Sequence, residues 1–176
     1  MPDHTALRAD ASEYAPYYGT YINPIADQNV FDLLTSQASA FDSLLSLNES
    51  QATHRYAPSK WSVKEVIGHV TDAERVFSYR MLRIARGDAT PLAGFEQQPY
   101  VDAAKFDSLP IATLIGSFHA TRAATLSLMS EIGDDAWPRM GVASGFPVSA
   151  RALAYIIAGH ATHHIGILRD RYGVSV

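Results

Sequence analysis

The sequence predicts an all-α protein, a four-helix bundle with long loops between its helices and an N-terminal arm. Four segments carry apolar residues at the period of about 3.6 that marks an amphipathic helix. No segment sustains the period of two that is typical of a strand. The chain has 176 residues and is 47% hydrophobic, which is enough for one core. We therefore expect an arm at residues 1–26 and a single four-helix-bundle domain at residues 27–176.

The first helix is expected at residues 27–47, directly after the arm. Pro16, Gly19 and Pro24 interrupt any helical period in the arm, and its tyrosines between positions 14 and 21 are expected to pack over the bundle. From residue 27 onward the apolar side chains fall on one helical stripe: Val30, Leu33, Leu34, Phe41, Leu44 and Leu45.

The second helix is expected at residues 63–86 and has a well-marked start. Ser62 and Glu65 have the spacing of a capping box, in which each side chain bonds the backbone amide of the other residue. Trp61 and Val66 can close around this turn as a hydrophobic staple. Gly87 is placed to end the helix.

The third and fourth helices are expected at residues 109–131 and 150–172. Asp107 or Ser108 can cap the third, Ser149 can cap the fourth, and Gly173 can end it. The loops before these two helices are long and contain Pro and Gly. Loops of such length are uncommon unless they have a function, so we expect them to line a site.

Composition excludes several classes of protein. The chain has no cysteine, so it has no disulfide, no thiolate metal site and no thiol of its own. The net charge is −4 and no basic cluster stands out, which argues against nucleic acid and against an anionic membrane surface. The first residues include acids and no apolar signal region, so the expected location is cytoplasmic.

His160 and His164 are the clearest anomaly on an apolar stripe. They lie at i and i+4 in the middle of the fourth helix's stripe, so both imidazoles face the core side by side. Burying two imidazoles together costs free energy unless a group satisfies both. A metal ion would do so, and the alternative is a pair of structural core histidines.

His69 in the second helix is the expected third ligand. It lies at the edge of its stripe, and a glycine precedes it just as Gly159 precedes His160. A mid-helix glycine costs about 1 kcal/mol relative to alanine, so a close backbone approach of neighbouring helices is expected at both positions. His163 lies off the stripe and is expected at the boundary of the core.

Other polar residues also face inward. Arg122 lies on the third helix's stripe and Glu74 at the core edge of the second. They can form a buried ion pair, or Arg122 can anchor an anionic substrate. Gln37 also faces inward and can support the site. Asp72 is either a solvated surface acid or a support for His69.

The chain resembles the DinB/YfiT-like superfamily. The resemblance rests on KWSVKEVIGHVTDAERVFSYR at residues 60–80, on ARGDATPLAGF at 85–95, and on HATHHIG at 160–166. It implies a four-helix bundle, often a homodimer, with one Ni or Zn ion bound by His69, His160 and His164.

Three histidines would leave one position open on a tetrahedral ion. The first expectation is a metal-dependent transferase that joins an external low-molecular-weight thiol to a small-molecule electrophile. The alternatives are a metal-dependent hydrolase that uses a metal-bound hydroxide, and a non-enzymatic metal-binding bundle of the stress response. An accessible pocket at the open position would favour an enzyme.

Overall fold

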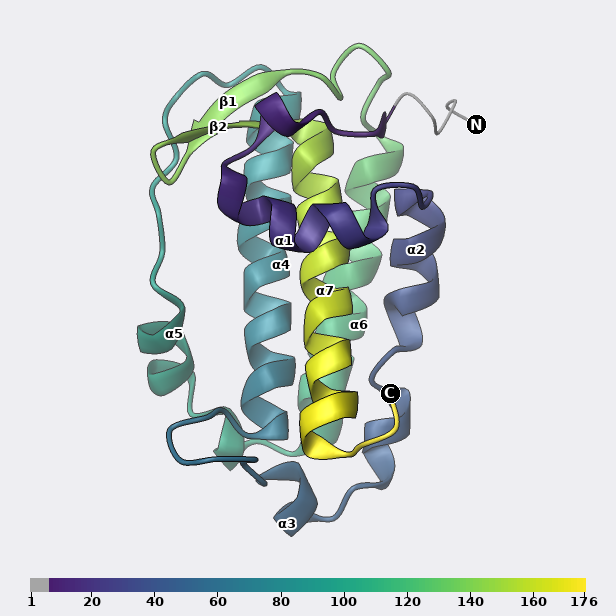
Figure 1. The fold of residues 1–176 in the computed structure, drawn as a ribbon, viewed down its shortest axis with the longest axis vertical. Helices are drawn as coiled ribbons and strands as arrows, with labels where there is room; N and C mark the ends of the chain where they lie inside the picture. Colours follow the sequence, from purple (N-terminus) through teal and green to yellow (C-terminus); the bar gives the residue numbers. More distant parts are fainter. Residues whose placement is uncertain (1–6) are drawn as a thin grey trace.

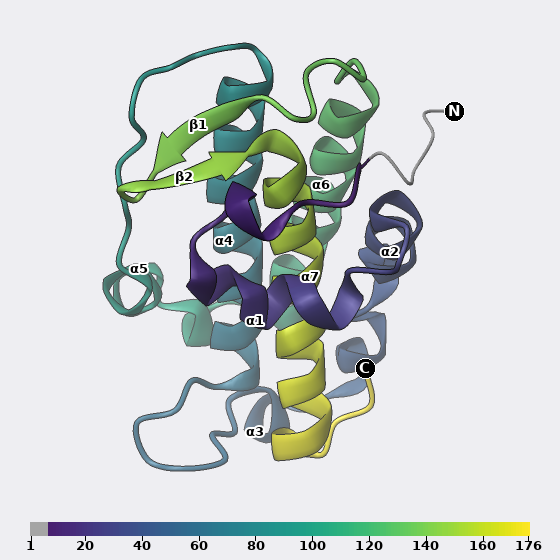
Figure 2. The same cartoon turned by 45° about the horizontal axis from the view of Figure 1, so that its top comes forward.

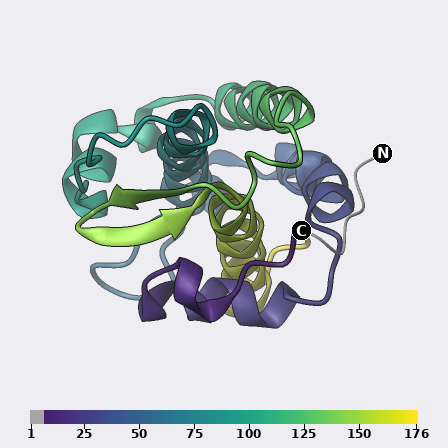
Figure 3. The same ribbon diagram turned by 90° about the horizontal axis from the view of Figure 1, so that it is seen from above.

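The computed structural model describes residues 7–176 and has the predicted four-helix bundle (Figure 1). Its main helices are α2 (Val30–Ser36), α4 (Val63–Ala85), α6 (Ile111–Ser130) and α7 (Ala150–Tyr172). Helix α4 packs against α6 and α7, and α2 packs against the same two helices from the opposite corner (Figure 3). The bundle therefore brings α4 and α7, the two helices that carry the predicted metal ligands, into direct contact.

The ends of α4 and α7 follow their predicted signals. The Ser62 hydroxyl accepts a hydrogen bond from the Glu65 amide, and the Glu65 carboxylate accepts one from the Ser62 amide, which completes the capping box. Gly87 follows α4 with a φ of +81°. The Ser149 hydroxyl caps α7, and Gly173 ends it with a φ of +66°. These positive φ angles suit glycine, which has no side chain to clash there.

The predicted cap of α6 is wrong. The helix begins at Ile111, two residues later than expected, with Pro110 at its cap position and no side-chain cap. The Asp107 carboxylate instead accepts a hydrogen bond from Ser62, the cap of α4. Ser108 lies in a 3₁₀ turn, Phe106–Ser108. The carboxylate that was expected to serve α6 thus helps to fix the start of α4.

The predicted helix at residues 27–47 is also wrong in its length. Helix α2 ends at Ser36 and is followed by two 3₁₀ turns, Gln37–Ser39 and Asp42–Ser46. The Leu34 carbonyl, which would accept the next α-helical hydrogen bond, accepts one of 2.9 Å from the Arg122 guanidinium instead. A buried arginine on another helix thus bonds the backbone acceptor at the end of α2.

The long loops contain regular structure that the sequence did not predict. Two strands, β1 (Met140–Ala143) and β2 (Phe146–Ser149), pair in an antiparallel hairpin across Ser144 and Gly145, which both have positive φ. Strands this short carry too few residues for their alternation to be recognised. Helix α5 (Gln97–Ala104) lies in the loop after α4, and α3 (Glu49–Ala52) lies at the opposite end of the bundle from the hairpin (Figure 1).

The N-terminal arm crosses α7 and includes a short helix, α1 (Gly19–Ile22) (Figures 1 and 2). Three 3₁₀ turns flank it: Ala11–Glu13, Pro16–Tyr18 and Asn23–Ile25. Tyr14 and Tyr21 are buried, as expected of tyrosines packed on the bundle, whereas Tyr17 is 61% exposed. Residues 1–6 of the predicted arm lie outside the described residues.

The core divides into two apolar clusters with a polar layer between them. One cluster joins the arm to the halves of α4 and α7 nearest the hairpin, and the other fills the end near α3. Buried polar side chains lie at the level where the clusters meet: Gln37, His69, Glu74, Arg122, His160 and His164. Within residues 7–176, no helix has the length and apolar character needed to cross a bilayer.

Candidate metal centre

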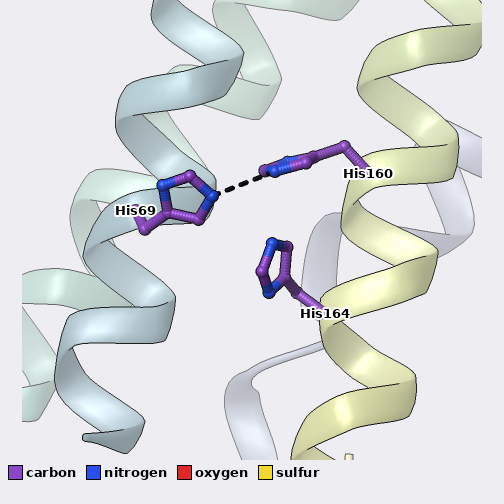
Figure 4. A group of neighbouring side chains, drawn as sticks. All are labelled: His69, His160 and His164. Carbon is purple, nitrogen blue, oxygen red and sulfur yellow. Dashed lines mark hydrogen bonds between the residues drawn. The ribbon is translucent and has the colours of Figure 1, made fainter. Parts of the chain in front are cut away.

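His69 of α4 and His160 and His164 of α7 point toward one another across the interface of these helices (Figure 4). The Nε2 atoms of His69 and His160 are 3.0 Å apart, with one ring donating a hydrogen bond to the other. The His164 ring centroid lies 4.9 Å from that of His69 and 4.5 Å from that of His160. The structure thus brings together the three histidines that the sequence singled out.

The glycine before each of two histidines permits a close contact, as predicted, but the contact differs from the one expected. A β-carbon on Gly159 would lie 2.6 Å from the Tyr21 carbonyl carbon, and one on Gly68 would lie 2.6 Å from ring atoms of Phe106. These partners belong to the arm and to the 3₁₀ turn after α5, rather than to neighbouring long helices. Each glycine therefore allows a connecting segment to pack closely against the helix at the position next to a histidine.

Burial keeps the three imidazoles neutral. His69 and His160 are each 3% exposed, and His164 is 8% exposed. Desolvation lowers the pKa of His69 to about 4. Burial, reinforced by the neighbouring histidines, also holds the pKa values of His160 and His164 well below the ordinary value for histidine. At neutral pH all three rings therefore keep a free lone pair, which is the form that binds a metal ion.

The geometry fits a divalent ion with imidazole ligands. In a tetrahedral zinc site with Zn–N bonds of about 2.0–2.1 Å, ligand nitrogens lie roughly 3.3 Å apart. The possible ligand atoms here all lie within 4.8 Å of one another, so small rotations of the rings would suffice. In addition, His164 Nδ1 is buried without a hydrogen-bond partner in the part of the chain that the structure describes. Such atoms are rare in folded proteins. Trp137 Nε1 is another, and an ion or other ligand bound at His164 Nδ1 would satisfy the histidine nitrogen.

Aromatic rings enclose the three histidines. The Trp61 ring lies 4.5 Å from that of His69, and the Tyr21 ring lies 5.3 Å from that of His160 in an edge-to-face contact. Phe77 approaches His160 from α4 at 6.0 Å. His163 is exposed and contacts Tyr21 and His164 from outside this group, which matches its predicted boundary position.

Arg122 is not available as a substrate anchor in this structure. Its side chain is fully buried, and Nε and Nη2 each donate a 2.8 Å hydrogen bond to the Glu74 carboxylate. Nη1 donates to the Leu34 carbonyl and to Gln37 Oε1. These contacts favour the buried ion pair over the anchor, because every part of the guanidinium is already engaged.

Gln37 and Asp72 have separate positions around the site. The Gln37 amide donates hydrogen bonds to the Ala158 carbonyl and to the Thr162 hydroxyl, on either side of His160 along α7. Gln37 therefore links the Arg122 pair to the helix that carries two of the histidines. Asp72 accepts a 2.9 Å hydrogen bond from Arg75 at the surface of α4, which favours its interpretation as a solvated acid.

A cavity of about 270 Å³ reaches His164 from the α3 end of the bundle. We call it the Trp61 cavity; its lining includes Tyr56, Lys60, Trp61, Gln98, His164 and Tyr172. From the sequence, His164 was predicted as a ligand and Trp61 was assigned only to a helix staple, whereas Tyr56, Lys60, Gln98 and Tyr172 were given no role. The sequence did contain one signal. Trp61 lies eight residues before His69 and Tyr172 lies eight residues after His164, about two helical turns in each case. In antiparallel helices these two offsets lead toward the same end of the bundle.

Comparisons with known proteins agree with this fold. A family model described as the DinB superfamily matches residues 33–168. Among solved structures, the chain is similar to YfiT from Bacillus subtilis, described as a probable metal-dependent hydrolase with an unusual four-helix bundle topology. The TM-score is 0.73 at 14% sequence identity, and the match covers 96% of this chain and 99% of that one. No curated protein matches the chain.

Proposed function

The chain belongs to the DinB superfamily, and on that basis we propose that it is a metal-dependent hydrolase whose single divalent ion is held by His69, His160 and His164. The observation that carries the proposal is the convergence of three buried imidazoles without any carboxylate in the group. Burial keeps the imidazoles neutral, which is the form that binds an ion. Without an ion, their contacts with one another leave part of their hydrogen-bonding capacity unused in a buried place, which costs free energy.

We propose Zn or Ni as the ion, because neutral imidazole is a suitable ligand for both. When bound, such an ion would polarise a substrate carbonyl and lower the pKa of a water molecule to about 7.

The residues of the chain itself would exclude water and orient the substrate. Trp61 covers His69, while Tyr21 and Phe77 pack against His160, so these rings close the site on the arm side and along α4. The Trp61 cavity leaves an approach to His164. A substrate that enters by this route would meet the metal centre from one defined direction, which limits the orientations that it can take.

Two other functions predicted from the sequence remain competing outcomes. An external low-molecular-weight thiol would also approach through the Trp61 cavity, because the chain has no cysteine of its own. A non-enzymatic metal-binding bundle would need no such cavity, and the presence of one beside His164 favours an enzyme.

The proposal is tested with protein purified without a nickel column, stripped with a chelator, and reloaded with Zn²⁺ or Ni²⁺. We expect the loaded protein to hydrolyse 4-nitrophenyl acetate and the stripped protein to lose this activity. His160→Ala should abolish it, whereas His119→Ala should not, because His119 is an exposed histidine paired with Asp42.

A parallel assay with glutathione, coenzyme A, bacillithiol or mycothiol and monochlorobimane separates hydrolysis from thiol transfer. Metal-dependent conjugation with one thiol, in protein that hydrolyses no ester or amide, would support the transferase function and contradict the hydrolase function. Stoichiometric metal binding with neither activity would leave the non-enzymatic bundle.

A further inference from the structure

The walls of the Trp61 cavity are aromatic and held in place. The Trp61 indole donates a 3.0 Å hydrogen bond to Gln98 Oε1 on α5, and its backbone carbonyl accepts one of 2.5 Å from the Tyr172 hydroxyl on α7. The Tyr56 ring packs edge-to-face on Tyr172 at 5.0 Å. Because these rings are fixed before a ligand arrives, a flat apolar group could bind between them at little entropic cost.

The lining of this cavity includes one cationic side chain, that of the exposed residue Lys60. Lys60 is the one residue of its lining that carries a formal charge, and no Asp or Glu belongs to that lining. Among the ion pairs formed within residues 7–176, none includes Lys60. The contrast with Arg55 nearby is clear, because Arg55 is paired with both Glu65 and Asp107. A negative group that enters the cavity would therefore meet an unpaired cation.

The backbone conformation at Ser59 supports the same interpretation. Ser59 also lines the cavity and has a φ of +61°, in the left-handed region that residues with a side chain rarely adopt. The strained residue lies directly before Lys60 and Trp61. Local strain of this kind is often found where a binding site fixes the position of neighbouring side chains.

The size of the cavity limits the ligand. A volume of about 270 Å³ is below the range of roughly 300–1,000 Å³ that is typical of drug-sized ligands. One ring with a short substituent suits such a volume.

We infer that the Trp61 cavity binds a single aromatic ring bearing one negative charge, with the ring between Trp61 and Tyr172 and the anionic group at Lys60. If the proposed function holds, on which this step rests, the substrate is an ester or amide that contains such an aromatic ring with one negative charge. For 4-acetoxybenzoate, hydrolysis breaks the bond between the acyl carbon and the phenolic oxygen. Water supplies a hydroxyl to the acyl carbon and a proton to the phenolic oxygen, so that the products are acetic acid and 4-hydroxybenzoate.

A binding experiment tests the inference without catalysis. The probes are benzoate, its neutral counterpart benzamide, and phenyltrimethylammonium, titrated by calorimetry and by tryptophan fluorescence. We expect benzoate to bind about three- to fivefold more tightly than benzamide, which is the scale of a solvent-exposed ion pair. The cation should bind most weakly. The fluorescence change should disappear in Trp61→Phe, which retains Trp137, the second of the two tryptophans.

Lys60→Gln should reduce the preference for benzoate to less than twofold, and Lys105→Gln is the matched control. Lys105 is exposed and lies outside the cavity, so its loss should leave the preference intact. Each titration is repeated on chelator-stripped protein, because a carboxylate could also bind a metal ion directly. A preference that depends on the metal and not on Lys60 would overturn the inference, as would equal binding of all three probes.

A hydrolysis experiment connects the inference to the reaction. Metal-loaded protein is given 4-acetoxybenzoate, 4-acetoxybenzamide and 4-acetoxyphenyl-trimethylammonium. We expect kcat/KM to be highest for the anion and to fall about three- to fivefold in Lys60→Gln for that ester alone. Hydrolysis of all three at equal rates would overturn the inference and leave the proposed function in place. Lys60-dependent binding of benzoate without hydrolysis of any of the three esters would support the inferred binding site and contradict the proposed hydrolase function.

Discussion

Gly159 of α7 lies against the backbone carbonyl of Tyr21, one residue before the candidate metal ligand His160. A β-carbon at position 159 would approach the Tyr21 carbonyl carbon to 2.6 Å. Backbone atoms cannot move aside as a flexible side chain can, so any other residue here must displace either the arm or α7. This contact therefore links the packing of the arm to the position of His160.

The first prediction concerns this contact. Gly159→Ala should lower the free energy of unfolding by about 1–3 kcal/mol through overpacking, despite the better helix propensity of alanine. Gly116→Ala is the control: this glycine lies within α6 with no atom near its missing β-carbon, so alanine there should add roughly 0.5–1 kcal/mol. Urea denaturation measures both changes. Equal stabilisation of the two variants would mean that the arm does not press on Gly159.

The second prediction concerns the identity of the metal ligands. His164→Ala should abolish stoichiometric binding of Zn²⁺ or Ni²⁺, because it leaves two of the three buried imidazoles. His163→Ala should retain the metal, since this neighbour is exposed and lies outside the group. Elemental analysis after dialysis measures the content. Full occupancy in the His164 variant would remove His164 from the ligand set.

The third prediction concerns the effect of the metal on stability. An ion that binds only the folded chain adds RT ln(1 + [L]/Kd), about 2.7 kcal/mol at a hundredfold excess over Kd. Removal of the ion should therefore lower the melting temperature by roughly 5–10 °C in a domain of this size. Differential scanning fluorimetry with and without chelator measures the shift, with His164→Ala as a control that should not respond. An unchanged wild-type curve after verified removal would contradict the prediction.

The fourth prediction concerns the Glu74–Arg122 pair. Glu74→Gln removes the charge that compensates a fully buried guanidinium, and it should cost about 3–5 kcal/mol of stability. The double variant Glu74→Leu/Arg122→Met should recover most of this loss, because it removes both charges. Glu131→Gln, in an exposed pair with Arg86, should change stability by less than about 1 kcal/mol. A small effect of Glu74→Gln would show that Arg122 is accessible to solvent after all.

The fifth prediction concerns Glu13, which joins the arm to the start of α7. Burial acts to raise the pKa of Glu13, but hydrogen bonds from Arg151, Ser149 and the Asp10 amide outweigh it, so that the pKa lies below the usual range. A carboxyl with a depressed pKa in the folded state stabilises the fold above its ordinary pKa and loses this contribution as the pH falls.

Glu13→Gln should therefore cost about 1.5 kcal/mol at pH 7, and the difference from wild type should shrink as the pH falls below about 4. Thermal melts from pH 7 to pH 3 measure this dependence. A difference that stayed constant over the whole range would assign the effect of the substitution to packing rather than to charge.

Much of the fold could be predicted because its signals are local. Ser62, Glu65 and Gly87 mark the ends of α4 within a few residues, and the apolar stripe of α7 makes His160 and His164 stand out. A pair at i and i+4 is fixed by helix geometry alone. Its closeness to His69 was predicted from the packing of the two helices that the pattern required.

The features that were missed depend on contacts between distant segments. Helix α2 ends earlier than predicted, and its Leu34 carbonyl accepts a hydrogen bond from Arg122, which is 88 residues away in the sequence. The Asp107 carboxylate likewise accepts a hydrogen bond from Ser62, 45 residues away in the sequence, and does not cap α6. The Trp61 cavity is built from the segment before α4, from α5 and from the end of α7. The apolar periodicity of a single segment cannot predict a cavity that three separate segments form together.

The separation of His69 and His160 along the chain has a consequence for the order of folding. These two residues are 91 positions apart, whereas His160 and His164 lie about one helical turn apart on α7. Closing so long a segment costs chain entropy that only the docking of α7 on α4 can recover. During synthesis α4 emerges long before α7, so the three imidazoles cannot meet until the last helix has been made and packed. A chain that stops before α7 would keep His69 but would lack His160 and His164, so it could not form the group of three histidines.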